Sequence, residues 1–245
     1  LFIISFNMSA QNDYPAGVQK LLSAYPQTIK GYEEPYLIMH NGNKIKYVEA
    51  NKKSHTDLMS SSDIGDIFTY KYIRGKVEDI PENYDPGRIR NEELLKEMYG
   101  STSQEVQRNL RTIIWCPKLI NQKLRVTTIN GVDKQLQKVS DELDKHPELK
   151  VFLKSMGTFN WRQIRGTTRL SSHSFGTAID IAVKYSNYWQ WDCRCTSEDT
   201  NLKYKNRIPQ LIVDIFEKHG FIWGGKWYHY DTMNFEYRTE LLQSE

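Results

Sequence analysis

The chain has 245 residues, 39% of them hydrophobic and 12% aromatic, so it can bury a core of its own and is not a disordered polymer. Its 33 basic and 30 acidic residues leave a formal net charge of +3, which is too balanced for a nucleic-acid-binding surface. Beyond residues 1–10, no stretch approaches the roughly 18 apolar residues of a membrane span. We therefore expect one large domain, or one domain with an N-terminal elaboration, that binds no nucleic acid and has no membrane span.

Residues 1–10, LFIISFNMSA, are apolar and end in small residues, as do the hydrophobic region and cleavage site of a secretory signal peptide. The stretch lacks a starting Met and a basic segment, so we interpret it as the remnant of a clipped signal. A buried N-terminal strand is the alternative. The signal interpretation predicts an exported protein, periplasmic or extracellular.

Residues 11–104 are predicted to form an irregular extension that wraps the main domain. Residues 18–25 have a short helical pattern. The apolar-rich runs 36–39 and 44–48 flank an Asn-Gly pair, which is the strongest local signal for a β-hairpin. We therefore expect a helix followed by a hairpin at the start of the extension.

The second half of the extension is less regular. Residues 50–90 are polar and show no sustained hydrophobic period, so we expect loops and short helices. Residues 91–99 are predicted to be a helix, with Asn91 as its N-cap and apolar side chains on one side.

The main domain is predicted to span residues 105–245 with an α+β fold, a small antiparallel sheet flanked by helices. The elements that predict it are strand-like runs at 112–115 and 125–129, helices at 132–146 and 207–219, and two antiparallel strands within 221–237. In the second helix we expect Leu211, Ile212, Ile215 and Phe216 to face inward, and Gly220 to end it.

The three cysteines, Cys116, Cys193 and Cys195, are an odd number, so at least one is unpaired within the chain. Cys193 and Cys195 could form a local disulfide, half of a metal site, or two inert thiols. We favour the inert thiols, because the neighbouring residues supply no further metal ligands.

His173 and Asp180 lie seven residues apart with Gly176 between them. A glycine permits a tight bend, so the two side chains can converge. A catalytic zinc keeps three protein ligands and an open position for water, and these residues would be two of the ligands. Taken alone the pair is better explained by two solvated or core residues, but the full pattern Ser-x-His-x-x-Gly-x-Ala-x-Asp is far more specific.

That pattern resembles the motif of the zinc-dependent D-alanyl-D-alanine carboxypeptidases and L-alanyl-D-glutamate endopeptidases of bacterial cell walls, the VanY-type group. The matching positions are Ser171, His173, Gly176, Ala178 and Asp180, followed by Trp223-Gly224-Gly225, Trp227, Asp231, Phe235 and Glu236. The resemblance covers about residues 105–240. It implies the same α+β arrangement, a Zn²⁺ cofactor on the sheet, and peptidoglycan stem peptides as substrates.

In the second motif of such enzymes an acidic residue, two spacers and a histidine precede Phe-Glu. The resemblance makes Asp231 the general base and Glu236 a residue that borders the site and orients the ligand at 234. Asn234 stands where the third zinc ligand, a histidine, is expected. An amide oxygen binds zinc more weakly than an imidazole, so we expect reduced zinc affinity. His229 could replace the missing ligand, but we favour a hydrogen-bonded role for it within the aromatic strip.

A substrate carboxylate needs a cation to hold it, and arginine does so with two parallel hydrogen bonds. Arg162 lies at about the place where the resemblance implies a substrate-binding arginine, with Arg169 and Arg165 as rivals; Ser171 is a further substrate-binding candidate. The alternative for each arginine is a surface salt bridge. The aromatic run 185–191 could line a cell-wall groove or pack in the core.

Two functions follow from these motifs. The first is an exported zinc peptidase, a monomer, that cuts peptidoglycan stem peptides next to D-amino acids and is impaired by Asn234. The second is a pseudoenzyme of the same fold that binds cell-wall peptides without cutting them. Asn234 favours the pseudoenzyme, whereas the retained Asp231 favours the peptidase.

Overall fold

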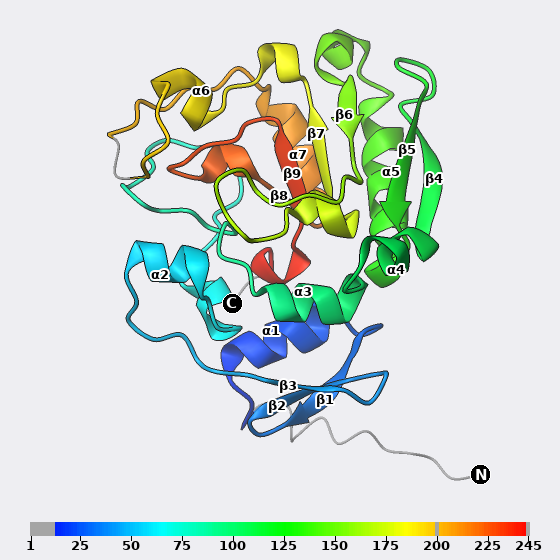
Figure 1. Cartoon of the computed structure of the whole chain (residues 1–245). Coiled ribbons are helices and arrows are strands. Elements are labelled where there is room, and N and C mark those ends of the chain that lie inside the picture. Colours follow the sequence, from blue (N-terminus) through cyan, green and yellow to red (C-terminus); the bar gives the residue numbers. More distant parts are fainter. Residues whose placement is uncertain (1–12, 199–200, 244–245) are drawn as a thin grey trace, which may run out of the picture.

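The computed structural model describes residues 13–198 and 201–243 (Figure 1). The signal-peptide prediction for residues 1–10 lies outside this part of the chain. Within the described residues, no helix combines the length and apolar character needed to cross a bilayer. The structure is of the α+β class, as expected, with helices packed around small antiparallel sheets.

The N-terminal part contains a three-stranded antiparallel sheet at one end of the molecule (Figure 1). Its elements are α1 (Ala16–Ala24), β1 (Ile29–Glu33), β2 (Tyr36–Met39), β3 (Lys44–Lys46), α2 (His55–Ser60), η2 (Gly65–Phe68), α3 (Glu92–Tyr99) and α4 (Ser103–Arg108). The predicted hairpin is β2–β3, to which β1 adds a third strand. The predicted cap of α3 is confirmed, since Asn91 Oδ1 accepts a hydrogen bond from the Leu94 amide at 2.8 Å.

The main domain is built on a four-stranded antiparallel sheet in the order β6-β7-β9-β8. The strands of this sheet are β6 (Ser155–Gly157), β7 (Ala178–Ile181), β8 (Phe221–Trp223) and β9 (Asn234–Tyr237). A separate antiparallel pair is formed by β4 (Leu110–Trp115) and β5 (Gln122–Thr127). The helices of the main domain are α5 (Val132–Leu143), α6 (Trp189–Cys193) and α7 (Gln210–Lys218), with 3₁₀ turns η3 (Ile129–Gly131), η4 (Pro147–Phe152), η5 (Ser172–Phe175), η6 (Val183–Tyr185), η7 (Gly224–Lys226) and η8 (Thr239–Leu241).

Helix α7 packs its apolar side against the four-stranded sheet. The Phe216 ring stacks on Phe235 of β9 with centroids 3.9 Å apart. Leu211, expected to face inward, is instead 40% exposed, and Val213 completes the buried side of the helix. The helix begins later than predicted because Pro209 occupies its N-cap, and a residue before proline is disfavoured in the helical region.

The N-terminal part shares one hydrophobic core with the main domain, which contains Val18 and Leu21 of α1 as well as Phe216 and Phe235. Buried polar contacts join the two parts. The Tyr72 hydroxyl donates to Glu217 Oε1 at 2.7 Å. The Trp227 indole donates to the Pro86 carbonyl at 2.7 Å. Residues 85–90 are thereby held beside the β7–β9 face.

Candidate active site

Two of the predicted metal-binding residues lie on neighbouring strands. Asp180 of β7 is the direct antiparallel partner of Asn234 on β9. Directly opposite residues of such a pair project from the same face of the sheet. The strand register therefore brings together two side chains that are separated by 54 positions in the sequence.

His173 reaches this pair from the 3₁₀ turn η5, which precedes β7. The Ser171 hydroxyl caps the turn by accepting the His173 amide at 3.4 Å. Gly176 ends the turn with φ +67°, and a Cβ there would lie only 2.8 Å from Leu110 Cδ2. The glycine of the motif thus allows both the left-handed bend and the close packing that aim His173 at Asp180.

The imidazole of His173 has a defined orientation. Its Nδ1 lies 3.0 Å from the Thr158 carbonyl oxygen, to which an N–H can donate, and its Nε2 lies 3.2 Å from Asp180 Oδ2. Burial lowers the pKa of His173, but the Asp180 carboxylate outweighs burial, so the pKa is raised from its ordinary value. A carbonyl that fixes one ring nitrogen, leaving the other for a cation, is the usual support of a metal-binding histidine.

Asn234 is oriented by Glu236 on the same strand. Its Nδ2 donates to Glu236 Oε1 at 2.9 Å. Because a carboxylate only accepts, the amide turns its NH₂ group to Glu236 and leaves Oδ1 as the atom available to a cation. Arg90 in turn holds both oxygens of Glu236, with Nε to Oε2 at 3.0 Å. Burial raises the pKa of Glu236, but Arg90 outweighs it and the pKa lies below its ordinary value.

Asp231, the predicted general base, faces the same cavity as His173, Asp180 and Asn234. Its Oδ1 is buried and has no hydrogen-bond partner among the described residues. Burial, followed by the charge of Asp180, raises the pKa of Asp231 to about 8. A buried carboxyl oxygen left unsatisfied costs stability, which indicates a group kept for a ligand or a reaction.

The donor set fits a divalent cation. His173, Asp180 and Asn234 offer one imidazole nitrogen, one carboxylate oxygen and one amide oxygen. The 3.2 Å between His173 Nε2 and Asp180 Oδ2 is close to the spacing of two donors on a tetrahedral zinc, about 3.3 Å for bonds of about 2.0 Å. An amide oxygen is a harder and weaker donor for zinc than imidazole, so reduced zinc affinity stays a prediction.

The cavity at this site has a volume of about 300 Å³ and is rich in arginine. The arginines that line it are Arg88, Arg90, Arg162, Arg165 and Arg169. Arg162 and Arg165 are exposed, whereas Arg169 is half-buried. No described residue makes a hydrogen bond or ion pair with the Arg169 guanidinium. Burial, together with Arg90 and Arg88, lowers the pKa of Arg169 to about 10. This unpaired cation is a candidate binder for an anionic ligand.

The aromatic run after β7 divides between core and cavity. Trp189 is 2% exposed and packs edge-on against His229, with centroids 4.9 Å apart. Trp191 is 55% exposed and lines the cavity beside Tyr188. The run therefore contributes both to the core and to the lining of the cavity, and its role in a cell-wall groove stays a prediction.

His229 fits the hydrogen-bonded role that we favoured for it. Its Nδ1 lies 2.7 Å from Asp85 Oδ2, and it is packed among aromatic rings. It does not join His173 and Asp180. It lies instead with His55 and Glu198, and the ligand atoms of these three residues lie within 4.8 Å of one another. Sequence reasoning missed His55, Asp85 and Arg88, because each comes from the N-terminal part and no motif surrounds it.

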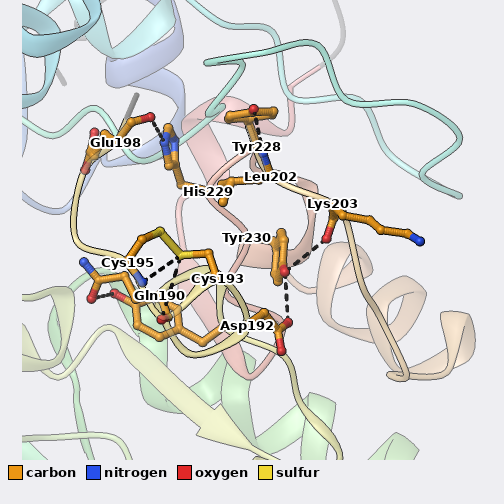
Figure 2. The surroundings of a disulfide bond; sticks show 11 residues. Gln190, Asp192, Cys193, Cys195, Glu198, Leu202, Lys203, Tyr228, His229 and Tyr230 are labelled. Atoms are coloured by element: carbon orange, nitrogen blue, oxygen red, sulfur yellow. Dashed lines mark hydrogen bonds between the residues drawn. A yellow bond between two sulfur atoms is a disulfide. The ribbon is translucent and has the colours of Figure 1, made fainter. Parts of the chain in front are cut away.

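The two neighbouring cysteines form a disulfide, which corrects our preference for inert thiols (Figure 2). Arg194 between them adopts φ +56°, and the Cα atoms of Cys193 and Cys195 lie 5.2 Å apart, within the range that a disulfide spans. Figure 2 shows the bridge at the start of the loop that carries Glu198 to His229. Cys116 is free and buried, and burial followed by the charge of Asp144 raises its pKa to about 12.

The comparison with protein families identifies a match over the region that carries this site. Residues 165–237 match the family model described as D-alanyl-D-alanine carboxypeptidase. No curated protein and no solved structure matches the chain. The matched segment includes Arg169, both motifs and Glu236, whereas Arg90 and the other cavity residues of the N-terminal part lie outside it.

Proposed function

We propose that the chain, whose residues 165–237 match the family model described as D-alanyl-D-alanine carboxypeptidase, is an exported peptidase. It would hydrolyse peptidoglycan stem peptides next to D-amino acids, as a carboxypeptidase or an endopeptidase. The observation that carries the proposal is the convergence of four side chains on one cavity. His173, Asp180 and Asn234 supply a cation site there, and Asp231 adds a carboxyl group without a structural partner.

The proposed cofactor is Zn²⁺, held by His173, Asp180 and Asn234. Bound zinc polarises a carbonyl and lowers the pKa of its water to about 7. Loss of a hydrogen bond to a zinc ligand already costs 10–100-fold in affinity or activity, and a changed ligand should cost at least about that much. We therefore propose a working site whose zinc affinity Asn234 has weakened.

Asp231 is proposed to move the proton. Its unpaired Oδ1 can take a proton from the attacking water and deliver it to the departing amine. Burial, followed by the Asp180 charge, raises its pKa to about 8, so the ionised carboxylate that accepts the proton predominates above that pH. A cation bound at the neighbouring ligands would favour the ionised form at lower pH. Glu236, held by Arg90, orients Asn234 and is proposed to take no part in proton transfer.

Arg169 is proposed to bind the substrate carboxylate. It faces the cavity and its guanidinium has no partner among the described residues, so its five donors are available. A guanidinium holds a carboxylate with two parallel hydrogen bonds. Arg162 and Arg165 line the same cavity at its exposed side and would draw an anionic peptide toward it.

The disulfide supports the proposal of export. Disulfides such as Cys193–Cys195 persist in oxidising compartments and are rare in the cytosol. The bridge closes a loop at the cavity rim, since Trp191, two residues before it, lines the cavity. An extracellular or periplasmic location would also give the site access to cell-wall peptides.

A pseudoenzyme that binds peptides without cutting them is the second candidate, and Asn234 is the observation that favours it. The arginine-rich cavity would serve a binding protein equally well. The unsatisfied Asp231 carboxyl argues against it, because a buried unpaired oxygen costs about 1–3 kcal/mol and contributes nothing to holding an acidic peptide.

Zinc titration and peptide hydrolysis test the proposal together. Metal-free wild-type protein and its Asn234→His variant are titrated with Zn²⁺ by calorimetry, and each is assayed with muropeptides. We expect the histidine variant to bind zinc at least about 10–100-fold more tightly and both forms to cleave. Cleavage by the histidine variant alone would identify the chain as a pseudoenzyme. Cleavage by neither would refute the peptidase proposal.

A further inference from the structure

A second cluster of metal-binding side chains lies at the rim of the cavity. It joins His55 at the start of α2, Glu198 in the loop after the disulfide, and His229 before β9. Their ligand atoms lie within 4.8 Å of one another. Figure 2 shows Glu198 and His229 facing each other, and His229 also lines the cavity.

The surroundings of His229 place an acceptor next to each of its ring nitrogens, Asp85 at Nδ1 and the Glu198 carbonyl at Nε2. Asp85 accepts from the His229 backbone amide at 3.0 Å and lies 2.7 Å from Nδ1. Burial raises the pKa of Asp85, but Arg88 and His229 outweigh it and lower the pKa to about 2, so Asp85 is an ionised acceptor and Nδ1 carries the proton. In neutral His229 the Nε2 lone pair then faces the Glu198 carbonyl oxygen at 2.9 Å. Two acceptors at that distance require a proton or a cation between them.

His55 also has an unsatisfied nitrogen. Its Nε2 lies 3.1 Å from Glu198 Oε2, and its Nδ1 is buried without a partner among the described residues. Its ring stacks on that of His229, with centroids 5.4 Å apart. The two imidazoles and the Glu198 carboxylate thus form one compact group, in which His55 Nδ1 has no partner among the described residues.

The charges around the cluster favour a cation. Arg88 forms ion pairs with both Asp85 at 2.7 Å and Glu198 at 2.6 Å, so one guanidinium serves two carboxylates. Burial opposes ionisation of Glu198, but His55 and Arg88 hold its pKa well below its usual range. The charge of Glu198 acts to raise the pKa of Arg169, but the two side chains form no ion pair. Because two carboxylates share one guanidinium, a bound cation would balance the remaining negative charge.

We propose that His55, Glu198 and His229 form a second metal site, which holds a divalent transition-metal ion such as Zn²⁺. Two imidazoles and one carboxylate are a donor set that zinc favours. Asp85 holds His229 through Nδ1, as carboxylates commonly hold metal-binding histidines. The metal would tie α2 of the N-terminal part to the cavity rim, next to but separate from His173 and Asp180.

Titration with Co²⁺, followed by its visible absorption, tests this site apart from the proposed active site. The background is His173→Ala, which removes an imidazole from the other cluster. We expect this metal-free variant to bind one Co²⁺ per chain with nitrogen ligation. Adding His55→Ala should weaken binding by at least about 100-fold, and adding Glu198→Gln, which preserves side-chain shape, should weaken it by about 10-fold or more.

His40→Ala is the matched control, because the His40 ring contacts the Pro26 carbonyl on the exposed surface and its loss should leave metal binding unchanged. Thermal unfolding in the presence of a chelator shows whether each variant is folded. The proposal is overturned if the His173→Ala protein binds no Co²⁺, or if His55→Ala and Glu198→Gln both leave its affinity unchanged. Nitrogen-15 spectra showing His229 protonated on both ring nitrogens at pH 8, without metal uptake, would identify the cluster as a buried imidazolium pair instead.

Discussion

The cavity is bordered by two clusters that are built in opposite ways. His173, Asp180 and Asn234 come from one turn and two paired strands, so strand register alone sets their spacing. His55, Glu198 and His229 come from a helix of the N-terminal part and two loops, and tertiary packing sets their spacing. The first can be recognised as a motif in the sequence, whereas the second becomes visible only in the fold.

The clusters also differ in how their carboxylates are balanced. Beside the motif residues, Arg90 neutralises Glu236, but Asp231 keeps an oxygen without a partner. In the second cluster Asp85 and Glu198 share Arg88, and the unsatisfied atom belongs to His55. A carboxyl left free suits proton transfer, whereas free imidazole nitrogens suit metal binding.

The largest effect is expected from Asp231→Asn. If Asp231 transfers the proton, the variant should lose about 10²–10⁴-fold in kcat for muropeptide hydrolysis, while zinc affinity stays within a few-fold. Where wild-type turnover is too slow to follow, the comparison is made in the Asn234→His background. An unchanged kcat would show that the unpaired carboxyl oxygen of Asp231, which distinguishes the first cluster from the second, has no role in catalysis.

Arg90→Ala tests whether the N-terminal part supports the motif cluster. Removing Arg90 leaves the Glu236 carboxylate, 2% exposed, without its bidentate partner. Breaking a buried ion pair from one side costs about 3–5 kcal/mol, measurable by urea unfolding. Lys44→Ala, which breaks the exposed pair with Glu33, is the matched control and should change the unfolding free energy little. Equal losses in the two variants would contradict a supporting role for Arg90.

Arg169→Ala should raise KM for a peptide that ends in a free carboxylate by about 10–100-fold, the equivalent of one charge-assisted hydrogen-bond pair. The same peptide with an amidated end should lose far less. Arg108→Ala is the control, since Arg108 is exposed and does not line the cavity. Equal effects on both peptides would show that Arg169 does not bind the carboxylate.

The sequence predicted those features that depend on local pattern. The hairpin of β2 and β3, the Asn91 cap, the helices and the final strand pair all follow from signals within a few residues. Asn234 lies directly opposite Asp180 in the strand register, and both positions belong to motifs visible in the sequence.

What the sequence could not supply depends on contacts between distant segments. Arg90 meets Glu236 across 146 positions, and His229 meets Asp85 across 144. The disulfide was one of three alternatives and was not the favoured one. It accompanies a left-handed backbone at Arg194, a conformation uncommon outside glycine. Neither long-range packing nor one unusual dihedral leaves a periodic trace in the sequence.

The smallest effect concerns Cys116, which should be inert toward both clusters. Its thiol is fully buried, and with a pKa of about 12 almost none of it is thiolate at pH 8. Because the raised pKa favours the protonated form, reactivity should appear only as the pH approaches 12 or as the chain unfolds. Iodoacetamide should therefore leave the folded protein unlabelled at pH 8, with or without Zn²⁺. Labelling that zinc suppresses would place a sulfur ligand at one of the clusters and remove the contrast between them.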